Sequence, residues 1–194
     1  MPDHRLNPLT PLGSRVAQTN TVGPVTITEN VGLALASVAI RMGGDAAFAK
    51  AAKALNITLP PPGRASDSAL WLAPNQWMIE APFATHEDIV AYLKPAFGDA
   101  ASITEQTDAW VRFDLTGPDL HAMFELLCNL DTRAMKPGDG TRTVIEHLGC
   151  YVTRRAAGFT VLGPRSSAKT LHHALITAAK SAYRARKSLR CLTT

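Results

Sequence analysis

The histidines of this chain are the first residues to consider for acid–base or metal chemistry. Six are scattered along the sequence, and only His172 and His173 are neighbours. Adjacent side chains on a helix point about 100° apart, so this pair cannot ligate one metal ion together. No H-x-x-x-H or H-x-x-E-H spacing occurs, and His121 falls on the polar flank of an expected helix. The spacing therefore predicts no catalytic and no metal-ligating histidine.

The three cysteines are also too far apart for shared chemistry. Cys128, Cys150 and Cys191 form no C-x-x-C pair, which argues against a zinc site and against a thioredoxin-like motif. Cysteine is among the most frequently buried residue types. We therefore expect free cysteines in the core.

Glycine-rich segments do not supply a phosphate-binding loop either. Gly43-Gly44 and Gly138-Asp139-Gly140 fit neither G-x-G-x-x-G nor the P-loop spacing, and no serine lies in a G-x-S-x-G pattern. Both segments are typical of turns. The residues alone thus predict no catalytic, cofactor-binding or metal-binding position.

Positive charge gathers at the C-terminal end of a chain whose formal net charge is +4. The cations there are Arg184, Arg186, Lys187 and Arg190. A basic tail can bind nucleic acid, but such binding usually requires a basic stripe and interleaved aromatic residues, and only Tyr183 is present. A solvated helix end, where cations complement the helix dipole, explains the cluster equally well. We expect the second arrangement and no nucleic-acid partner.

The composition is that of an ordinary globular protein. Of 194 residues, 46% are hydrophobic and 19% charged. The longest apolar stretch, 31–40, is too short for a membrane span and contains Gly32 and Ser37. The N-terminus lacks the charged-then-apolar order of a secretory signal. We expect a cytoplasmic protein without a membrane partner.

The clearest structural pattern is a strand that runs directly into a helix, over residues 110–130. Residues 110–115 alternate polar and apolar, which predicts a half-buried strand. Thr116 and Asp119 have the spacing of a short capping box around Pro118. The apolar face of the helix that follows comprises Leu120, Met123, Phe124 and Leu127.

A similar order of elements occurs twice along the chain. The first series is strands 25–29 and 32–41, helix 46–55, a hairpin of 69–72 and 77–79, and a helix capped by Thr85 that Pro95 ends near residues 97–98. The second series is strands 102–105 and 110–115, then the helix that follows Thr116, then a hairpin of 150–153 and 159–162. It ends with a last helix capped by Ser166 or Ser167. An extra strand at 143–145 precedes the hairpin. Ile27-Thr28-Glu29 also matches Ile103-Thr104-Glu105.

This periodicity predicts an α+β fold with duplicated strand-strand-helix-hairpin-helix halves. The alternative is the coarse regularity that any α+β chain shows. The predicted organisation is an extended N-terminal arm (1–22), a first half (23–98), a second half (99–184) and a basic C-terminal tail (185–194).

The N-terminal arm holds several prolines and glycines but also Leu6, Leu9, Leu12 and Val16. It shows neither a strand nor a helix period, so it cannot form a core by itself. One interpretation is an arm that becomes ordered only against a partner protein. The other is a disordered tail.

Five segments carry a resemblance to a known family: "NPLTPLGSR", "VTITENVGLALASVAIRMGG", "ALWLAPNQWMI", "RFDLTGPDLHAMFELLCNLDTRAMKPGDGTRTVI" and "FTVLGPRSSAKTL". In this collinear order the chain resembles the gamma subunits of heterotetrameric sarcosine oxidases. That family is in turn similar in fold to the folate-binding domain of glycine-cleavage aminomethyltransferase.

The resemblance implies a non-catalytic subunit of an assembly that oxidatively demethylates sarcosine to glycine. Alpha, beta and delta subunits are the implied partners, and FAD, FMN, NAD, tetrahydrofolate and zinc are implied on those subunits, with no cofactor on this chain. One alternative is a stand-alone folate-dependent aminomethyl-transfer domain, for which no single carboxylate among Asp114, Asp119 and Asp131 can be assigned the role. Another is the gamma subunit of a related oxidase of dimethylglycine or a similar N-methyl amine.

Overall fold

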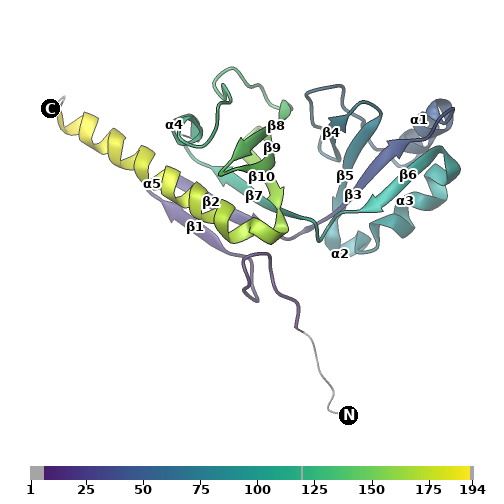
Figure 1. The fold of residues 1–194 in the computed structure, drawn as a ribbon, viewed down its shortest axis with the longest axis horizontal. Coiled ribbons are helices and arrows are strands. Elements are labelled where there is room, and N and C mark those ends of the chain that lie inside the picture. Colours follow the sequence, from purple (N-terminus) through teal and green to yellow (C-terminus); the bar gives the residue numbers. More distant parts are fainter. Residues whose placement is uncertain (1–6, 119, 193–194) are drawn as a thin grey trace, which may run out of the picture.

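The computed structural model describes residues 7–118 and 120–192, with side chains as far as residue 188. It contains two antiparallel sheets (Figure 1). The large sheet consists of β1 (Thr19–Val22), β2 (Val25–Asn30), β7 (Trp110–Thr116), β8 (Gly140–Ile145), β9 (Leu148–Arg155) and β10 (Gly158–Pro164). The small sheet consists of β3 (Leu33–Ile40), β4 (Ala69–Ala73), β5 (Gln76–Pro82) and β6 (Ala101–Glu105).

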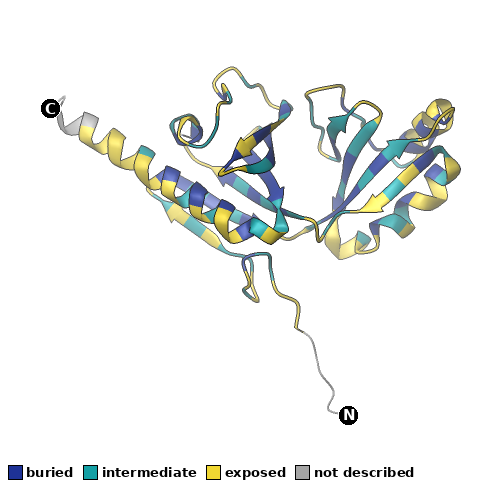
Figure 2. Ribbon diagram, in the orientation of Figure 1, coloured by how far each residue is buried: buried dark blue, intermediate teal, exposed yellow. Residues whose placement is uncertain are grey.

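Helices cover one face of each sheet. The α-helices are α1 (Asp45–Ala54), α2 (Phe83–His86), α3 (Ile89–Phe97), α4 (Leu120–Glu125) and α5 (Ala168–Leu192), and the 3-10 turns are η1 (Gly98–Ala100) and η2 (Arg165–Ser167). One core lies between the large sheet and α4 and α5, and a second between the small sheet and α1 and α3. These cores hold most of the buried residues seen in Figure 2.

The strand predicted at 110–115 is confirmed as β7, and its alternation has the expected cause. Val111, Phe113 and Leu115 are buried in the core under α4 and α5. The polar residues between them therefore lie on the opposite face of the large sheet, which faces the small sheet. A third, smaller apolar cluster fills the space between the two sheets and includes Leu35, Met78, Tyr151 and Leu162.

The strands pair across the predicted boundary between the halves. The large sheet has the order β1-β2-β7-β10-β9-β8 and the small sheet β4-β5-β3-β6. Thus β2, from residues 23–98, pairs with β7, and β6, from residues 99–184, pairs with β3. Residues 23–98 and 99–184 are therefore not separate sheets, because each sheet takes one strand from the other segment. The mixed α and β class with two antiparallel sheets is confirmed, and the duplication stays a prediction.

Glycine at position 117 is required where β7 ends beside β2. Its φ is +116°, and a Cβ atom there would lie 2.1 Å from the carbonyl oxygen of Pro24. Only glycine permits both this backbone conformation and this close approach. The Thr116–Asp119 capping box cannot be assessed, because Asp119 lies outside the described residues. The helix α4 ends at Glu125, so Leu127 follows it rather than extending its apolar face.

The helix predicted from Thr85 to about residues 97–98 is wrong at its start and confirmed at its end. Asp88 is the cap of α3, and its Oδ1 accepts a hydrogen bond from the Ala91 N–H at 2.9 Å. Thr85 lies instead in the short helix α2. Pro95 lies inside α3, which continues to Phe97. The buried Phe97 ring packs on Phe48 with centroids 4.8 Å apart, and this contact holds the last turn in place.

Both predicted terminal segments contain secondary structure. The arm predicted at 1–22 includes β1, which pairs with β2. Leu12 is buried in the core under α5, and its N–H donates to Glu29 Oε1 at 2.9 Å. The other carboxylate oxygen of Glu29 accepts from the Gln18 N–H at 3.0 Å. The tail predicted at 185–194 is helical as far as Leu192, the end of α5. Sequence periodicity missed the arm because β1 has only 4 residues and because Leu12 is held by Glu29, which lies 17 residues further along the chain.

A matched pair of leucines tests whether the arm is ordered in the free chain. Leu12 is 7% exposed and Leu9 53% exposed. We expect Leu12→Ala to lower the free energy of unfolding by about 2–3 kcal/mol, because it leaves a cavity in the core. Leu9→Ala should change it by less than about 0.5 kcal/mol. Urea denaturation of both variants measures the difference. Two equally neutral substitutions would show that the arm does not pack on the free chain.

Candidate functional site

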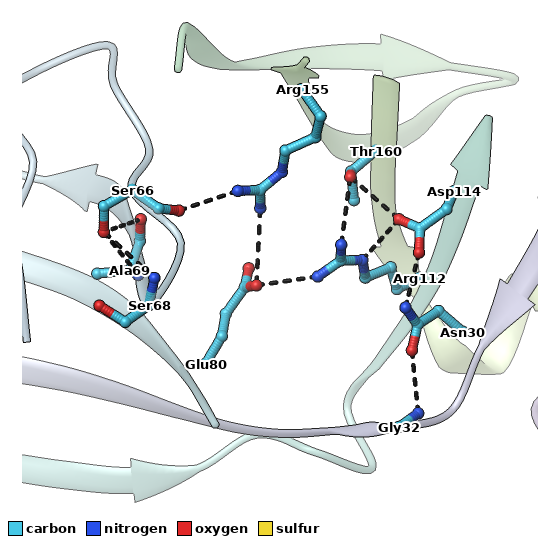
Figure 3. Close-up of polar contacts among 10 residues, drawn as sticks. All are labelled: Asn30, Gly32, Ser66, Ser68, Ala69, Glu80, Arg112, Asp114, Arg155 and Thr160. Carbon is cyan, nitrogen blue, oxygen red and sulfur yellow. Dashed lines mark hydrogen bonds and ion pairs between the residues drawn. The ribbon is translucent and has the colours of Figure 1, made fainter. Parts of the chain in front are cut away.

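A half-buried ionic cluster joins the two sheets (Figure 3). Glu80 projects from β5 of the small sheet, and Arg112 projects from β7 of the large sheet. Arg112 Nη1 lies 2.9 Å from Glu80 Oε2, and Arg155 Nη2, from β9, lies 3.6 Å from the same oxygen. The side chains of Glu80 and Arg112 are only 7% and 16% exposed. An ion pair so shielded from water is far less screened than one on the surface.

Asp114 extends this cluster along the large sheet. Arg112 Nε donates to Asp114 Oδ1 at 2.8 Å, and Thr160 Oγ1 donates to the same oxygen at 3.1 Å. Asn30 Nδ2 donates to Asp114 Oδ2 at 2.6 Å. The strand register brings these groups together, because Asn30 of β2 lies opposite Arg112 and Thr160 of β10 lies opposite Asp114. With two carboxylates and two guanidinium groups, the cluster is formally neutral.

Arg155 also connects the cluster to the loop that precedes β4 of the small sheet. Its Nη1 donates to the carbonyl oxygen of Ser66 at 2.9 Å. Ser66 Oγ in turn accepts hydrogen bonds from the N–H groups of Ser68 and Ala69. The guanidinium group of Arg155 therefore holds both Glu80 and the backbone that leads into β4.

Burial raises the pKa of the Glu80 carboxyl above its ordinary value, and the positive charges of Arg112 and Arg155 oppose this shift. The neighbouring carboxylate of Asp114 raises it further. Burial disfavours a charged carboxylate because the low-polarity surroundings solvate it poorly. Burial thus disfavours the charged form of Glu80, and its two arginine partners offset part of this effect.

A cavity of about 340 Å³ lies beside this cluster, where the chain crosses between the sheets. The chain passes from β2 to β3 through residues 31–32, and from β6 to β7 through residues 106–109. We call this space the crossover cavity. It is lined by Pro8, Leu9, Thr10, Pro11, Arg15, Asn30, Val31, Leu33, Leu35, Phe83, Thr107, Asp108, Trp110, Arg112 and Arg165.

The two ends of the cavity are built alike. Phe83 and Arg165 each follow the proline that ends the second strand of a hairpin. The Phe83 N–H donates to Gly32 O, and the Arg165 N–H donates to Ala109 O, both at 2.9 Å. Each hairpin is thus tied to one of the two crossing segments, which fixes the walls of the cavity.

The chemistry available at the cavity is recognition by cations and apolar surface. Its ionisable groups are Arg15, Arg112, Arg165 and Asp108. Arg112 is held by Glu80 and Asp114, while Arg165 lies 3.5 Å from Asp108. Asp114 already accepts three hydrogen bonds, so it is not a free general base. Within residues 7–118 and 120–192, no group of three or more His, Cys, Asp or Glu side chains could hold a metal ion.

The histidines and cysteines lie apart from this site. His172 stacks on Phe113 and hydrogen-bonds Asn20 at 2.9 Å, and burial lowers its pKa. His173 instead lies near Thr177 on the exposed side of α5, so the two neighbours diverge as expected. His121 Nδ1 lies 3.1 Å from Thr132 Oγ1.

Cys150 is a free, buried core residue, as predicted, and burial raises the pKa of its thiol to about 11. Cys128 is free and half-buried. The side chain of Cys191 lies outside the described residues.

Of the three carboxylates considered from the sequence, Asp114 lies in the cluster, and Asp119 lies outside the described residues. Asp131 accepts hydrogen bonds from the N–H groups of Arg133 and Ala134, which makes it a local turn residue. Sequence reasoning missed Glu80 and Arg155. A signal for Glu80 was available, because it is a lone charge in the otherwise apolar run from Trp77 to Ala81.

Among known proteins, similarity to this chain was found only with solved structures. No protein-family model and no curated protein matches this sequence. A chain of the heterotetrameric sarcosine oxidase from Corynebacterium sp. U-96 is similar with a TM-score of 0.68 and 21% identity, over 81% of this chain and 85% of that one. Glycine cleavage system aminomethyltransferase T from Bartonella henselae is similar with a TM-score of 0.54 and 18% identity, over 78% of this chain.

The chain has a folate-binding aminomethyltransferase-like fold. It spans 48% of the length of the aminomethyltransferase chain. No helix in the described part of the chain is long and apolar enough to cross a membrane.

Removing the Glu80 side chain tests the role of the ionic cluster. We expect Glu80→Ala to lower the free energy of unfolding by about 3–5 kcal/mol, because it leaves two guanidinium groups without their buried partner. Glu125→Ala is the control. It breaks the exposed pair with Arg133, at 2.8 Å, and should cost less than about 1 kcal/mol. Denaturant unfolding at neutral pH measures both, and equal effects would contradict a role for the cluster in joining the sheets.

The raised pKa of Glu80 predicts a specific pH dependence. The folded state holds the proton more tightly than the unfolded state, so Glu80 contributes stability that is fully present below its ordinary pKa of 4.5. This contribution is lost as pH rises through the elevated folded pKa. The Glu80→Gln side chain has nearly the same shape as glutamate, but it does not ionise. The stability advantage of the natural chain over Glu80→Gln should therefore shrink as pH rises through this range in urea unfolding series. An advantage that grows with pH would reverse the sign and contradict the prediction.

Proposed function

We propose that this chain is a non-catalytic, gamma-type structural subunit of a heterotetrameric sarcosine oxidase. The observation that carries the proposal is the near end-to-end match to one chain of that enzyme, which covers 81% of this chain and 85% of the other. The aminomethyltransferase match covers only 48% of the longer protein. A match that covers most of both chains favours a subunit of this kind over a transferase, of which the chain covers less than half.

In this proposal the assembly oxidatively demethylates sarcosine to glycine in the cytoplasm, with oxygen and tetrahydrofolate as acceptors. The partners are alpha, beta and delta subunits. FAD, FMN, NAD, tetrahydrofolate and zinc are assigned to those subunits, and none is assigned to this chain. The role of this chain is to present a folded surface to its partners. The geometry is consistent with that role, because the carboxylates of Glu80 and Asp114 are both paired with arginines of the same cluster.

The alternative is a stand-alone domain for folate-dependent aminomethyl transfer. The crossover cavity favours it, because apolar walls and Arg15 would suit a planar ligand that carries a carboxylate. Against it, the nearby carboxylate of Asp114 is occupied by Asn30, Arg112 and Thr160. A further alternative is a sister assembly that oxidises dimethylglycine or another N-methyl amine.

Co-expression with alpha, beta and delta subunits from the same source tests the proposal. We expect the chain to co-elute with all three in size-exclusion chromatography, and the complex to form hydrogen peroxide when sarcosine is added. The free chain should be colourless and should give no calorimetric signal with tetrahydrofolate. Tight binding of tetrahydrofolate by the free chain would overturn the proposal. So would a complex of the other three subunits that does not contain this chain. Faster turnover of dimethylglycine than of sarcosine would favour the sister assembly.

A further inference from the structure

Exposed apolar side chains concentrate around the crossover cavity. Leu9, Val31 and Phe83 are large apolar residues that line the cavity and also remain exposed at its rim. They come from three separate parts of the chain: the N-terminal arm, the β2–β3 crossing and the start of α2. Val16, also exposed, is the neighbour of the lining residue Arg15. Apolar residues from distant segments that gather at one cavity are typical of an interaction site.

The same surface carries an unneutralised positive charge. Three arginines and one aspartate line the cavity. Arg112 is neutralised by Glu80 and Asp114, and Arg165 by Asp108. Arg15 is exposed and has no ion-pair or hydrogen-bond partner within residues 7–118 and 120–192. The surface is therefore complementary to an apolar group that has a negative charge next to it.

The walls of the cavity are held in place before any partner binds. Leu12 anchors the arm, and Arg165 Nη2 donates to the carbonyl oxygen of Leu9 at 3.1 Å. Thr107 Oγ1 accepts from the Leu35 N–H at 2.9 Å, which ties the crossing segment 106–109 to the start of β3. A preformed surface binds at a lower entropic cost than one that must first become ordered.

We propose that the crossover cavity and its rim bind a polypeptide segment of a partner subunit, in which a bulky apolar side chain enters the cavity and an adjacent acidic residue pairs with Arg15. This rests on the proposed function. A polypeptide is favoured over a small molecule because a ligand inside the cavity would leave the rim residues Leu9, Val31 and Phe83 in water. A segment of chain covers the cavity and the rim together.

The test is competition between chains during co-expression with the alpha, beta and delta subunits. Each variant carries a different tag from the natural chain, and the ratio of tags in the purified assembly measures relative affinity. Val31→Glu places a charge in the apolar rim, and Arg15→Glu reverses the free cation. We expect each to reduce incorporation by about tenfold or more.

Two matched variants control for charge changes elsewhere. Val144 lies on the edge strand β8 and is 59% exposed, against 45% for Val31. Lys50 is an exposed cation on α1. We expect Val144→Glu and Lys50→Glu to be incorporated within about twofold of the natural chain. Urea unfolding of each free variant separates lost folding from lost binding, and Arg15→Glu carries the test if Val31→Glu does not fold.

The outcomes separate this inference from the proposed function. If the natural chain does not join the assembly, the proposed function has failed and this inference fails with it. If the natural chain joins and all four variants compete equally, only the inference is overturned. If the free chain forms a dimer in analytical ultracentrifugation that Val31→Glu abolishes, the occupant is a second copy, and the partner-segment inference is also overturned.

Discussion

Glu80 and its two arginines form the interaction on which the arrangement of the sheets depends. The inner faces of both sheets carry few apolar residues compared with the faces under the helices. A small apolar cluster and the Glu80 cluster must therefore hold the two sheets together. A buried carboxylate without partners is strongly unfavourable, whereas one placed between two guanidinium groups is tolerated. The cluster thus specifies how the sheets face each other, because only one relative position lets Glu80 meet both Arg112 and Arg155.

The exchange of strands between the sheets supports the same arrangement. Because β2 belongs to the large sheet and β6 to the small one, the covalent chain crosses between the sheets twice. A second polar contact lies away from these crossings, where Arg64 pairs with Asp139 and the two loops form backbone hydrogen bonds through Ala65 and Gly140. The sheets are therefore joined at both crossings, through the Glu80 cluster and through these loops.

The crossings also explain where the cavity lies. Residues 31–32 and 106–109 leave one sheet and enter the other, so no strand fills the space between them. The N-terminal arm covers part of that space, anchored by Leu12 and by the hydrogen bond from Leu12 to Glu29. The arm is thus a wall of the cavity as well as an edge of the large sheet. Binding at the cavity and order in the arm are expected to be linked for that reason.

The sequence by itself determined most of the secondary-structure elements but not the ionic cluster. Alternation at 110–115 and the apolar spacing of α1 and α5 are local signals, and the structure contains those elements. The separation of the histidines and cysteines was equally readable. Tertiary structure alone decided which strands pair, because period-two alternation gives a strand its buried face but not its neighbour. It also decided the burial of Leu12 and the meeting of Glu80 with Arg112 and Arg155, since these contacts join residues far apart in sequence and leave no periodic trace.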